Sequence, residues 1–332
     1  MSKALIIGLS SQDGSYLADL LLAKGYTVIG TIRRSTNFYQ KNIRHLTGKV
    51  HIEAADLIDS ESIARIIRRY QPDEIYNLAA QSVPADSWIQ PYYTGEITGL
   101  GVVRVLEAVR LYAPKARFYQ ATSREIFGNV SGVANESTPI DANNPYGIAK
   151  AYAHMMTRCY RGSYDLFACG GILFNHESPR RSLHFVTRKI TAAVACIKNG
   201  VKQPPLNELG VPLVSAEGKL ALGALESRRD WGYAPEYVDA MWRMLQNSNP
   251  KDYVIGTNRS HTVRDVCQVA FGYCGLDWQE HVVTNDELLR PTEIAALTGD
   301  STLAAAELGW RPQTTFEALI RLMVDADLER FH

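Results

Sequence analysis

Tyr146 and Lys150 are the residues whose types and spacing most clearly suit proton transfer. They belong to PYGIAK, residues 145–150, and a helix would place both side chains on one face. Pro145 fits the first turn of such a helix. A lysine ammonium near a phenol favours the phenolate and lowers the pKa of the Tyr, which then serves as a general base near neutral pH. The same spacing also arises by chance on exposed helices, so its place in the chain decides between the two interpretations.

A hydroxyl and a carboxylate lie just before this pair in the sequence. The predicted strand at residues 117–121 runs into Thr122, Ser123, Arg124 and Glu125. Ser123 completes the Ser, Tyr and Lys set of a simple alcohol dehydrogenase, which needs no carboxylate. Glu125 therefore indicates an additional proton transfer from carbon, with a structural carboxylate as the alternative. We predict that Ser123, Glu125, Tyr146 and Lys150 are the catalytic residues.

A glycine-bounded turn, GLSSQDG at residues 8–14, separates a predicted strand at 4–8 from a predicted helix at 14–24. Turns of this kind let backbone N–H groups and the helix dipole face a pyrophosphate. An ordinary strand-to-helix turn is the alternative, because the motif alone is weak. The predicted cofactor-binding residues here are Gly8, Ser10, Ser11, Gln12, Asp13 and Gly14.

The end of the predicted strand at residues 27–32 bears on the choice of dinucleotide. Arg33, Arg34 and Ser35 follow it, and arginines at this point suit a 2′-phosphate, whereas an acidic residue would hold a 2′-hydroxyl. NADP is therefore favoured over NAD, with a solvated basic turn as the alternative. Two further turns after predicted strands should lie along the cofactor, at Asp56, Leu57, Leu78, Ala79 and Ala80.

These residues require a scaffold of alternating strands and helices. Strands are predicted at 4–8, 27–32, 50–54, 74–80 and 117–121, and helices at 14–24, 63–70 and 99–111. Such alternation is typical of a Rossmann-type doubly wound α/β fold with a parallel sheet. We expect residues 1–173, with returning segments, to form an NADP-binding domain. Residues 174–332 should form a smaller mixed α/β substrate lobe, with a long loop at 202–219 and helices at 263–273, 301–308 and 316–328.

The composition limits the classes of function. The 332 residues are 46% hydrophobic, and 35 basic residues balance 35 acidic ones. Neither nucleic acid nor a membrane surface is an expected partner, because both usually need a basic excess. The five Cys are scattered without a CxxC pair, which fits a reducing cytoplasm. We identify no metal-ligand cluster, no membrane span and no signal peptide.

Several motifs together resemble one family, the GDP-mannose 4,6-dehydratases of the extended short-chain dehydrogenases. YNLAAQS (76–82) and RDWG (229–232) belong to the match, and GILFNHESPRR (171–181) is its most specific part. The remaining matching segments are residues 8–14, 117–121, 145–150, 185–190, 289–293 and 308–312. The resemblance covers essentially the whole chain.

The resemblance implies a dehydration without net redox change. Tyr146, with Lys150 and Ser123, would deprotonate the C4 hydroxyl of a GDP-sugar while hydride leaves C4 for NADP. Glu125 would remove the C5 proton and help expel the C6 hydroxyl, before hydride returns to C6. The family positions that contact cofactor correspond to Ser82, Tyr93, His176 and Arg181. Those that hold substrate correspond to Ser82, Ser123, Glu125, Asn175, Lys189, Arg229, Arg290 and Glu293.

The resemblance also implies a homodimer or homotetramer, joined in part through residues 33–37. Three departures from the family pattern leave alternatives open. Ser11 replaces a glycine of the phosphate turn, either donating a hydrogen bond to a phosphate or pushing the dinucleotide outward. Arg124 adds a cation that would stabilise the Glu125 carboxylate. Residues 202–221 form a longer stretch than in the family, close to the expected sugar site.

These departures leave four functions open. GDP-mannose is the expected substrate, and a GDP-linked manno-heptose is the alternative if the longer stretch shapes a roomier pocket. A nucleotide-sugar reductase or epimerase on the same scaffold would need no Glu125. A non-catalytic nucleotide-sugar-binding protein is the remaining possibility, and the retention of Ser123, Glu125, Tyr146 and Lys150 argues against it.

Overall fold

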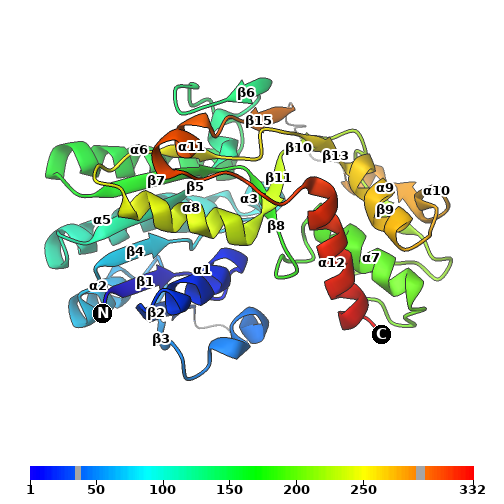
Figure 1. The fold of residues 1–332 in the computed structure, drawn as a ribbon, viewed down its shortest axis with the longest axis horizontal. Coiled ribbons are helices and arrows are strands. Elements are labelled where there is room, and N and C mark those ends of the chain that lie inside the picture. Colours follow the sequence, from blue (N-terminus) through cyan, green and yellow to red (C-terminus); the bar gives the residue numbers. More distant parts are fainter. Residues whose placement is uncertain (34–38, 289–295) are drawn as a thin grey trace.

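The computed structural model describes residues 1–33, 39–288 and 296–332. A seven-stranded sheet in which every neighbouring pair is parallel forms the larger part of the molecule (Figure 1). Its order is β3-β2-β1-β4-β5-β7-β12, so the chain runs outward in both directions from β1 and β4. The strands are β1 (Lys3–Ile7), β2 (Thr27–Ile32), β3 (His51–Ala54), β4 (Glu74–Asn77), β5 (Arg117–Ser123), β7 (Ala168–Leu173) and β12 (Tyr253–Ile255). The predicted Rossmann-type doubly wound sheet is confirmed.

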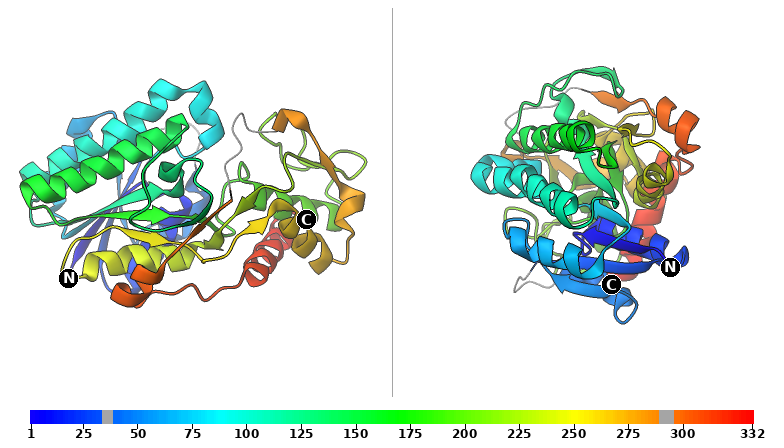
Figure 2. Two further views of the ribbon diagram at one scale, coloured as in Figure 1. Left: turned by 90° about the horizontal axis from the view of Figure 1, so that it is seen from above. Right: turned by 90° about the vertical axis from the view of Figure 1, so that its left-hand side faces the viewer.

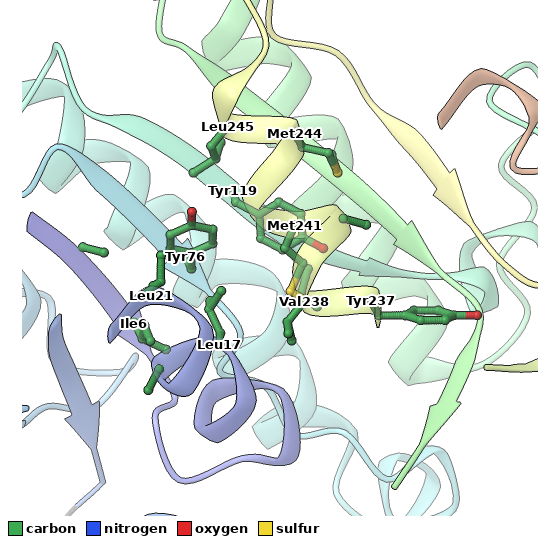
Figure 3. Close-up of a cluster of buried hydrophobic side chains, with 14 of the residues drawn as sticks. Ile6, Leu17, Leu21, Tyr76, Tyr119, Tyr237, Val238, Met241, Met244 and Leu245 are labelled. Carbon is green, nitrogen blue, oxygen red and sulfur yellow. The ribbon is translucent and has the colours of Figure 1, made fainter. Parts of the chain in front are cut away.

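Helices cover both faces of the sheet, as Figure 2 shows from above. One face packs against α2 (Ser60–Tyr70), α5 (Gly101–Tyr112) and α6 (Pro145–Tyr164), and the other against α1 (Gln12–Ala23), α8 (Ala234–Gln246) and α11 (Thr302–Leu308). Central strands are therefore apolar on both sides, and β7 is buried at every position. Figure 3 shows part of one core, in which Met241 and Leu245 of α8 face Tyr76 and Tyr119 of the sheet.

The C-terminal half supplies a second, smaller lobe. Its core joins α7 (Val186–Lys198), α9 (Val263–Tyr273) and α12 (Phe316–Arg330), with α10 (Trp278–His281) at its edge. Residues 234–255 return to the main sheet as α8 and β12. Four two-stranded pairs complete the lobe and its junction with the sheet: β8 (Asn175–Glu177) with β11 (Trp231–Tyr233), β9 (Leu220–Leu222) with β14 (Val282–Thr284), β10 (Arg228–Arg229) with β13 (His261–Thr262), and β6 (Gly132–Ala134) with β15 (Leu297–Gly299).

Short helices connect these elements. Two short α-helices and a π-helical turn follow β4, and four 3-10 turns occur in three other connections of the described chain. They are α3 (Pro84–Ile89), α4 (Pro91–Thr94), the π-helical η3 (Gly95–Leu100), η1 (Tyr39–Asn42), η2 (Arg44–Leu46), η4 (Arg124–Phe127) and η5 (Asp286–Leu288). No helix in residues 1–33, 39–288 or 296–332 is long and apolar enough to cross a membrane.

Most predicted elements occur, with some different ends. The predicted strand at 74–80 ends at Asn77, and the predicted helix at 99–111 begins at Gly101 after a π-helical turn. The predicted strand at 117–121 continues to Ser123. The helix predicted at 63–70 begins at Ser60, because the Asp59 side chain caps it by accepting from the N–H groups of Glu61 and Ser62.

Candidate active site

The carboxyl ends of the central strands open into a cavity of about 520 Å³ between the sheet and the C-terminal lobe. Ligands bind at this position in doubly wound sheets. All four predicted catalytic residues line it, from the end of β5 and from α6. Nine other predicted binding residues also line it: Asp13, Leu78, Ala80, Ser82, Asn175, His176, Arg181, Lys189 and Arg229.

Tyr146 and Lys150 lie on the first turns of α6, and both are almost completely buried. The Lys150 ammonium donates to the backbone carbonyl of Ala121, 2.7 Å away, and lies 5.8 Å from the centre of the Tyr146 ring. Burial lowers the pKa of Lys150 to about 8, because the charged form loses its hydration. One cavity thus holds the predicted redox pair.

The expected lowering of the Tyr146 pKa is wrong for this structure. Burial raises the pKa of Tyr146, and hydrogen bonding with Ser123 opposes that increase only in part. The negative charge of Glu125 also raises this pKa. The spacing of Tyr146 and Lys150 indicates their common face, whereas desolvation depends on the whole fold.

Glu125 lies in η4, directly after β5, and is buried. One of its carboxylate oxygens accepts a hydrogen bond of 3.0 Å from the Asn144 side chain, and the other lies 3.6 Å from Arg124 Nε. The cation expected beside Glu125 is therefore close to it. The carboxylate shares the cavity with Tyr146, so the cavity holds a second group that can accept a proton.

Asn144 is a residue that the sequence interpretation missed. Its side-chain oxygen accepts from the N–H of Gly147 at 2.8 Å and so caps α6, while its side-chain nitrogen donates to Glu125. One side chain therefore fixes the helix of Tyr146 relative to the carboxylate of Glu125. The signal was present, because an Asn before a Pro at the first helical position is typical of an N-cap.

The phosphate turn is closely packed around its glycines. Gly8 has a φ of +97°, and a Cβ there would lie 2.9 Å from the backbone N of Ala79. A Cβ on Gly14 would lie 2.3 Å from the carbonyl O of Gly8, so neither position admits a side chain. The first turn of α1 carries Asp13 at the cavity. These features fit a strand-to-helix turn that receives a pyrophosphate.

Ser11 caps α1 within this turn. Its hydroxyl donates to the carbonyl of Gly8 at 2.8 Å and accepts from the N–H of Gly14 at 2.9 Å. The hydroxyl hydrogen is thus directed at the turn itself in this structure, and the two alternatives for Ser11 towards a bound dinucleotide stay open. The serine stabilises the conformation that the turn needs.

Asp13 and His176 join the phosphate turn to β8. His176 Nε2 lies 2.9 Å from the Asp13 carboxylate, and Nδ1 lies 2.8 Å from the carbonyl of Phe174. Both partners only accept hydrogen bonds, so both ring nitrogens must donate, which requires the imidazolium. Although burial opposes it, the Asp13 charge raises the pKa of His176. Gln12 strengthens the junction by donating to the carbonyl of His176 at 3.0 Å.

The other predicted cofactor residues lie outside the cavity lining of the described chain. Arg33 donates a hydrogen bond to the hydroxyl of Tyr93, so these two predicted cofactor residues lie together. The side chain of Leu57 packs in the core beneath α5. Ser10, Asp56 and Ala79 lie in turns after β1, β3 and β4. Arg34, Arg290, Glu293 and the rest of segment 34–37 lie outside the described residues.

Two predicted substrate residues add positive charge from the C-terminal lobe. Lys189 lies in the first turns of α7, and Arg229 lies in β10. Asn175 in β8 and Arg181 complete this side, and Arg181 Nε lies 3.2 Å from the Glu177 carboxylate. No group of three or more His, Cys, Asp and Glu side chains that could hold a metal ion occurs in the described part of the chain.

Comparison with known proteins agrees with this geometry. The sequence profile of the GDP-mannose 4,6 dehydratase family matches residues 5–323. The chain belongs to this family. GDP-mannose 4,6 dehydratase 2 of Arabidopsis thaliana is 46% identical over 98% of this chain and 87% of its own length. The Homo sapiens enzyme is 40% identical over 98% and 91%, and the Yersinia enterocolitica enzyme 40% identical over 99% and 95%.

Solved structures of other sugar-nucleotide enzymes have the same fold. The UDP-glucose 4-epimerase of Thermotoga maritima, with UDP-glucose, has a TM-score of 0.85 at 22% identity, covering 99% of this chain and 100% of the epimerase. The dTDP-glucose 4,6-dehydratase of Bacillus anthracis, with NAD, has a TM-score of 0.80 at 21% identity, covering 98% and 96%. At these identities the likeness concerns the fold alone.

Proposed function

We propose that this protein is a GDP-mannose 4,6-dehydratase, a lyase that forms the 4-keto-6-deoxy sugar. The observation that carries the proposal is the buried carboxylate of Glu125 in one cavity with Ser123, Tyr146 and Lys150. A reductase or epimerase needs only the last three. Membership in the family agrees with this interpretation.

The cofactor in this proposal is a nicotinamide dinucleotide on the phosphate turn. When bound, its nicotinamide accepts a hydride from C4 of the sugar and returns it to C6. The crowded glycines at 8 and 14 and the N-terminus of α1 suit its pyrophosphate. We favour NADP, because Arg33 and Arg34 follow β2, where a 2′-phosphate would lie.

Ser123, Tyr146 and Lys150 would prepare the sugar for elimination. The Tyr146 oxygen takes the proton of the C4 hydroxyl, and hydrogen bonding with Ser123 favours the phenolate against the effect of burial. The Lys150 ammonium, fixed by the Ala121 carbonyl, contributes positive charge beside the phenol. A ketone at C4 then makes the C5 proton acidic.

Glu125 would carry out the elimination. Its carboxylate removes the C5 proton, and the same proton can leave with the C6 hydroxyl as water. Asn144 holds the carboxylate in place through its hydrogen bond. Once the hydride had returned to C6, and C5 had received a proton in place of the one that Tyr146 took from the C4 hydroxyl and then released, the sugar would have lost one water and the cofactor would be unchanged.

The C-terminal lobe would bind the GDP part. Lys189, Arg229 and Asn175 line its side of the cavity, and guanidinium groups suit a diphosphate. Arg290 and Glu293 belong to the same proposed set. We accordingly assign cofactor binding mainly to residues 1–173 and substrate binding mainly to 174–332.

A GDP-linked manno-heptose is the second candidate substrate. The observation that favours it is the contribution of the long loop to the cavity, since Glu208 and Leu209 belong to the lining. The same chemistry at C4, C5 and C6 applies if this wall leaves space for an additional carbon at C6.

A mass assay tests both candidates. The purified protein is incubated with GDP-mannose or with GDP-manno-heptose without reductant. We expect one of the two substrates to give a product that is lighter by one water, without net change in the amount of NADPH. A product of unchanged mass, or stoichiometric NADPH consumption, contradicts dehydration. Glu125→Gln should reduce turnover at least ~100-fold, as loss of a general acid–base group does. Glu61→Gln, on the exposed part of α2, is the control and should retain full turnover.

A homodimer or homotetramer is supported by an exposed apolar stripe on α6. Ile148, Tyr152 and Met155 are 56%, 40% and 58% exposed and recur at helical spacing. Exposed stripes of this kind often mark interfaces. The sugar-nucleotide chemistry and the free thiols of all five Cys are consistent with a cytoplasmic location, which we also propose.

A further inference from the structure

The long loop at residues 202–219 is tied firmly to the C-terminal lobe. Leu213 and Val214 are buried in the core of that lobe. Leu206 and Pro212 pair in an isolated antiparallel bridge, and the N–H of Leu213 donates to the carbonyl of Pro205 at 2.7 Å. The loop is therefore a hydrogen-bonded hairpin that is anchored in the core of the lobe, so its tip has a defined position.

Asn207 shapes the tip of this hairpin. Its side-chain oxygen accepts from the N–H groups of Leu209 and Val211 at 2.9 and 3.2 Å. Gly210 has a φ of +74°, which completes the tight reversal. The turn presents Glu208 and Leu209 to the cavity.

Glu208 forms an ion pair with Lys189 across the cavity wall. The Lys189 side chain is only 11% exposed and that of Glu208 is 31% exposed, so water screens the pair less than it would at the open surface. Lys189 lies in the first turns of α7, where the helix dipole adds positive potential. The positive charge at Lys189 attracts anions to this part of the cavity, and the carboxylate of Glu208 is the anion that pairs with it.

That carboxylate conflicts with the proposed substrate. A sugar linked to GDP carries a doubly negative diphosphate, which needs cations in the cavity. Glu208 neutralises one of these cations and adds a negative charge to the lining of the cavity in which the diphosphate would lie. The Glu208 carboxylate and the diphosphate cannot both contact Lys189, because the two negative groups would repel each other strongly at that distance.

We propose that Glu208 is a specificity-determining residue, whose carboxylate holds Lys189 until the substrate's diphosphate displaces it. The inference rests on the proposed function, because it assumes that a GDP-sugar binds in this cavity. When the diphosphate displaces Glu208, Lys189 exchanges one anionic partner for another. The new ion pair with the diphosphate offsets the loss of the pair with Glu208. A ligand without an anionic group at this position breaks the pair and receives nothing in return, and it is therefore excluded.

Binding of GDP alone tests this inference without relying on turnover. The dissociation constant of GDP is measured by calorimetry for the wild type, Glu208→Gln and Glu217→Gln. We expect Glu208→Gln to bind GDP about three- to tenfold more tightly, the size of one partly exposed ion pair. Glu217→Gln removes the same charge from the same loop outside the cavity lining, and should leave binding unchanged.

A second pair of variants separates displacement from general repulsion. In a Lys189→Met background, Glu208→Gln should no longer tighten GDP binding, because no ion pair remains to be broken. An equal gain in both backgrounds shows that Glu208 acts by repulsion alone and overturns the inference. With GDP-mannose, Glu208→Gln should lower KM while leaving kcat unchanged.

The outcomes also separate this inference from the proposed function. If the wild type dehydrates GDP-mannose but Glu208→Gln binds GDP equally or more weakly, the inference fails alone. Weaker binding would mean that Glu208 itself contacts the nucleotide. If the wild type binds neither GDP nor GDP-mannose, the proposed function fails and the inference fails with it.

Discussion

Asn144 connects two tasks that the chemistry requires to be coordinated. It caps the helix of Tyr146 and donates to the carboxylate of Glu125, so it sets the distance between the two proposed proton-transfer groups. Neither task involves the substrate directly. Asn144 is therefore a positioning residue, and a substitution can separate its two hydrogen bonds.

Asn144→Asp retains a good helix cap but replaces the donor with a charge that repels Glu125. We expect kcat to fall about 10- to 100-fold, the range for losing a hydrogen bond to a charged group, with KM nearly unchanged. Asn144→Ser, which caps without adding charge, should lose less activity. The free energy of unfolding of Asn144→Ser should lie within ~1 kcal/mol of the wild-type value. Asn144→Asp should lose more stability, because its added charge is buried beside Glu125. Equal kcat in Asn144→Asp and the wild type would contradict the positioning role.

Lys150 contributes to the site at the expense of stability. Burial lowers the pKa of Lys150 to about 8, below its usual value in an unfolded chain. Because the pKa of Lys150 is lower in the folded than in the unfolded chain, the protein has its full stability only above the unfolded-state pKa. That stability is lost as the pH falls through 8. The buried ammonium therefore destabilises the folded protein at neutral pH by about 3 kcal/mol, before its hydrogen bond is considered.

Lys150→Met should be inactive yet more stable than the wild type at pH 7. After subtracting the lost hydrogen bond to Ala121, we expect a gain of about 2 kcal/mol in the free energy of unfolding. The gain should shrink between pH 8 and pH 10. Urea unfolding of nucleotide-free protein at several pH values measures it, with the exposed Lys115→Met as the control. A gain that is constant with pH would refute the buried-charge explanation.

At the scale of elements, the sequence predicts what depends on local pattern. Strands β1 and β2 alternate with helices in a regular order, and the period of the apolar residues is sufficient to find them. The strand at 74–80 was predicted too long, because Leu78 and the small residues after Asn77 are apolar although they form the turn beside Gly8. The two- and three-residue strands of the C-terminal lobe pair over long distances in sequence and show no periodicity.

The same distinction applies to the site. The common face of Tyr146 and Lys150 follows from helical spacing, and the turn glycines from their place between strand and helix. The Asn144–Glu125 and Lys189–Glu208 contacts depend on how separate elements pack, so no local pattern reveals them. The raised pKa of Tyr146 has the same origin, because burial is a property of the assembled cavity.

At the scale of the whole molecule, the proposed active site lies between two lobes of different construction. The carboxyl edge of the sheet carries the proposed catalytic residues, while the C-terminal lobe contributes cationic side chains and the hairpin of Glu208. Figure 1 shows the sheet and the C-terminal lobe. Helix α6 belongs to both the interior and the exterior of this assembly. Its inner face carries Tyr146 and Lys150, and its outer face carries Ile148, Tyr152 and Met155.

The outer face of α6 predicts how copies of the chain associate. Met155→Arg places a charge at one end of the apolar stripe, and burying it unpaired in an interface would cost several kcal/mol. We expect the mass measured by sedimentation equilibrium to fall from that of a dimer or tetramer to a smaller species. Val283→Arg makes the same change on β14 of the C-terminal lobe and should leave the mass unchanged. Because association stabilises the folded chain, loss of the interface should also lower the unfolding temperature. An unaltered mass for Met155→Arg would exclude this face as the interface.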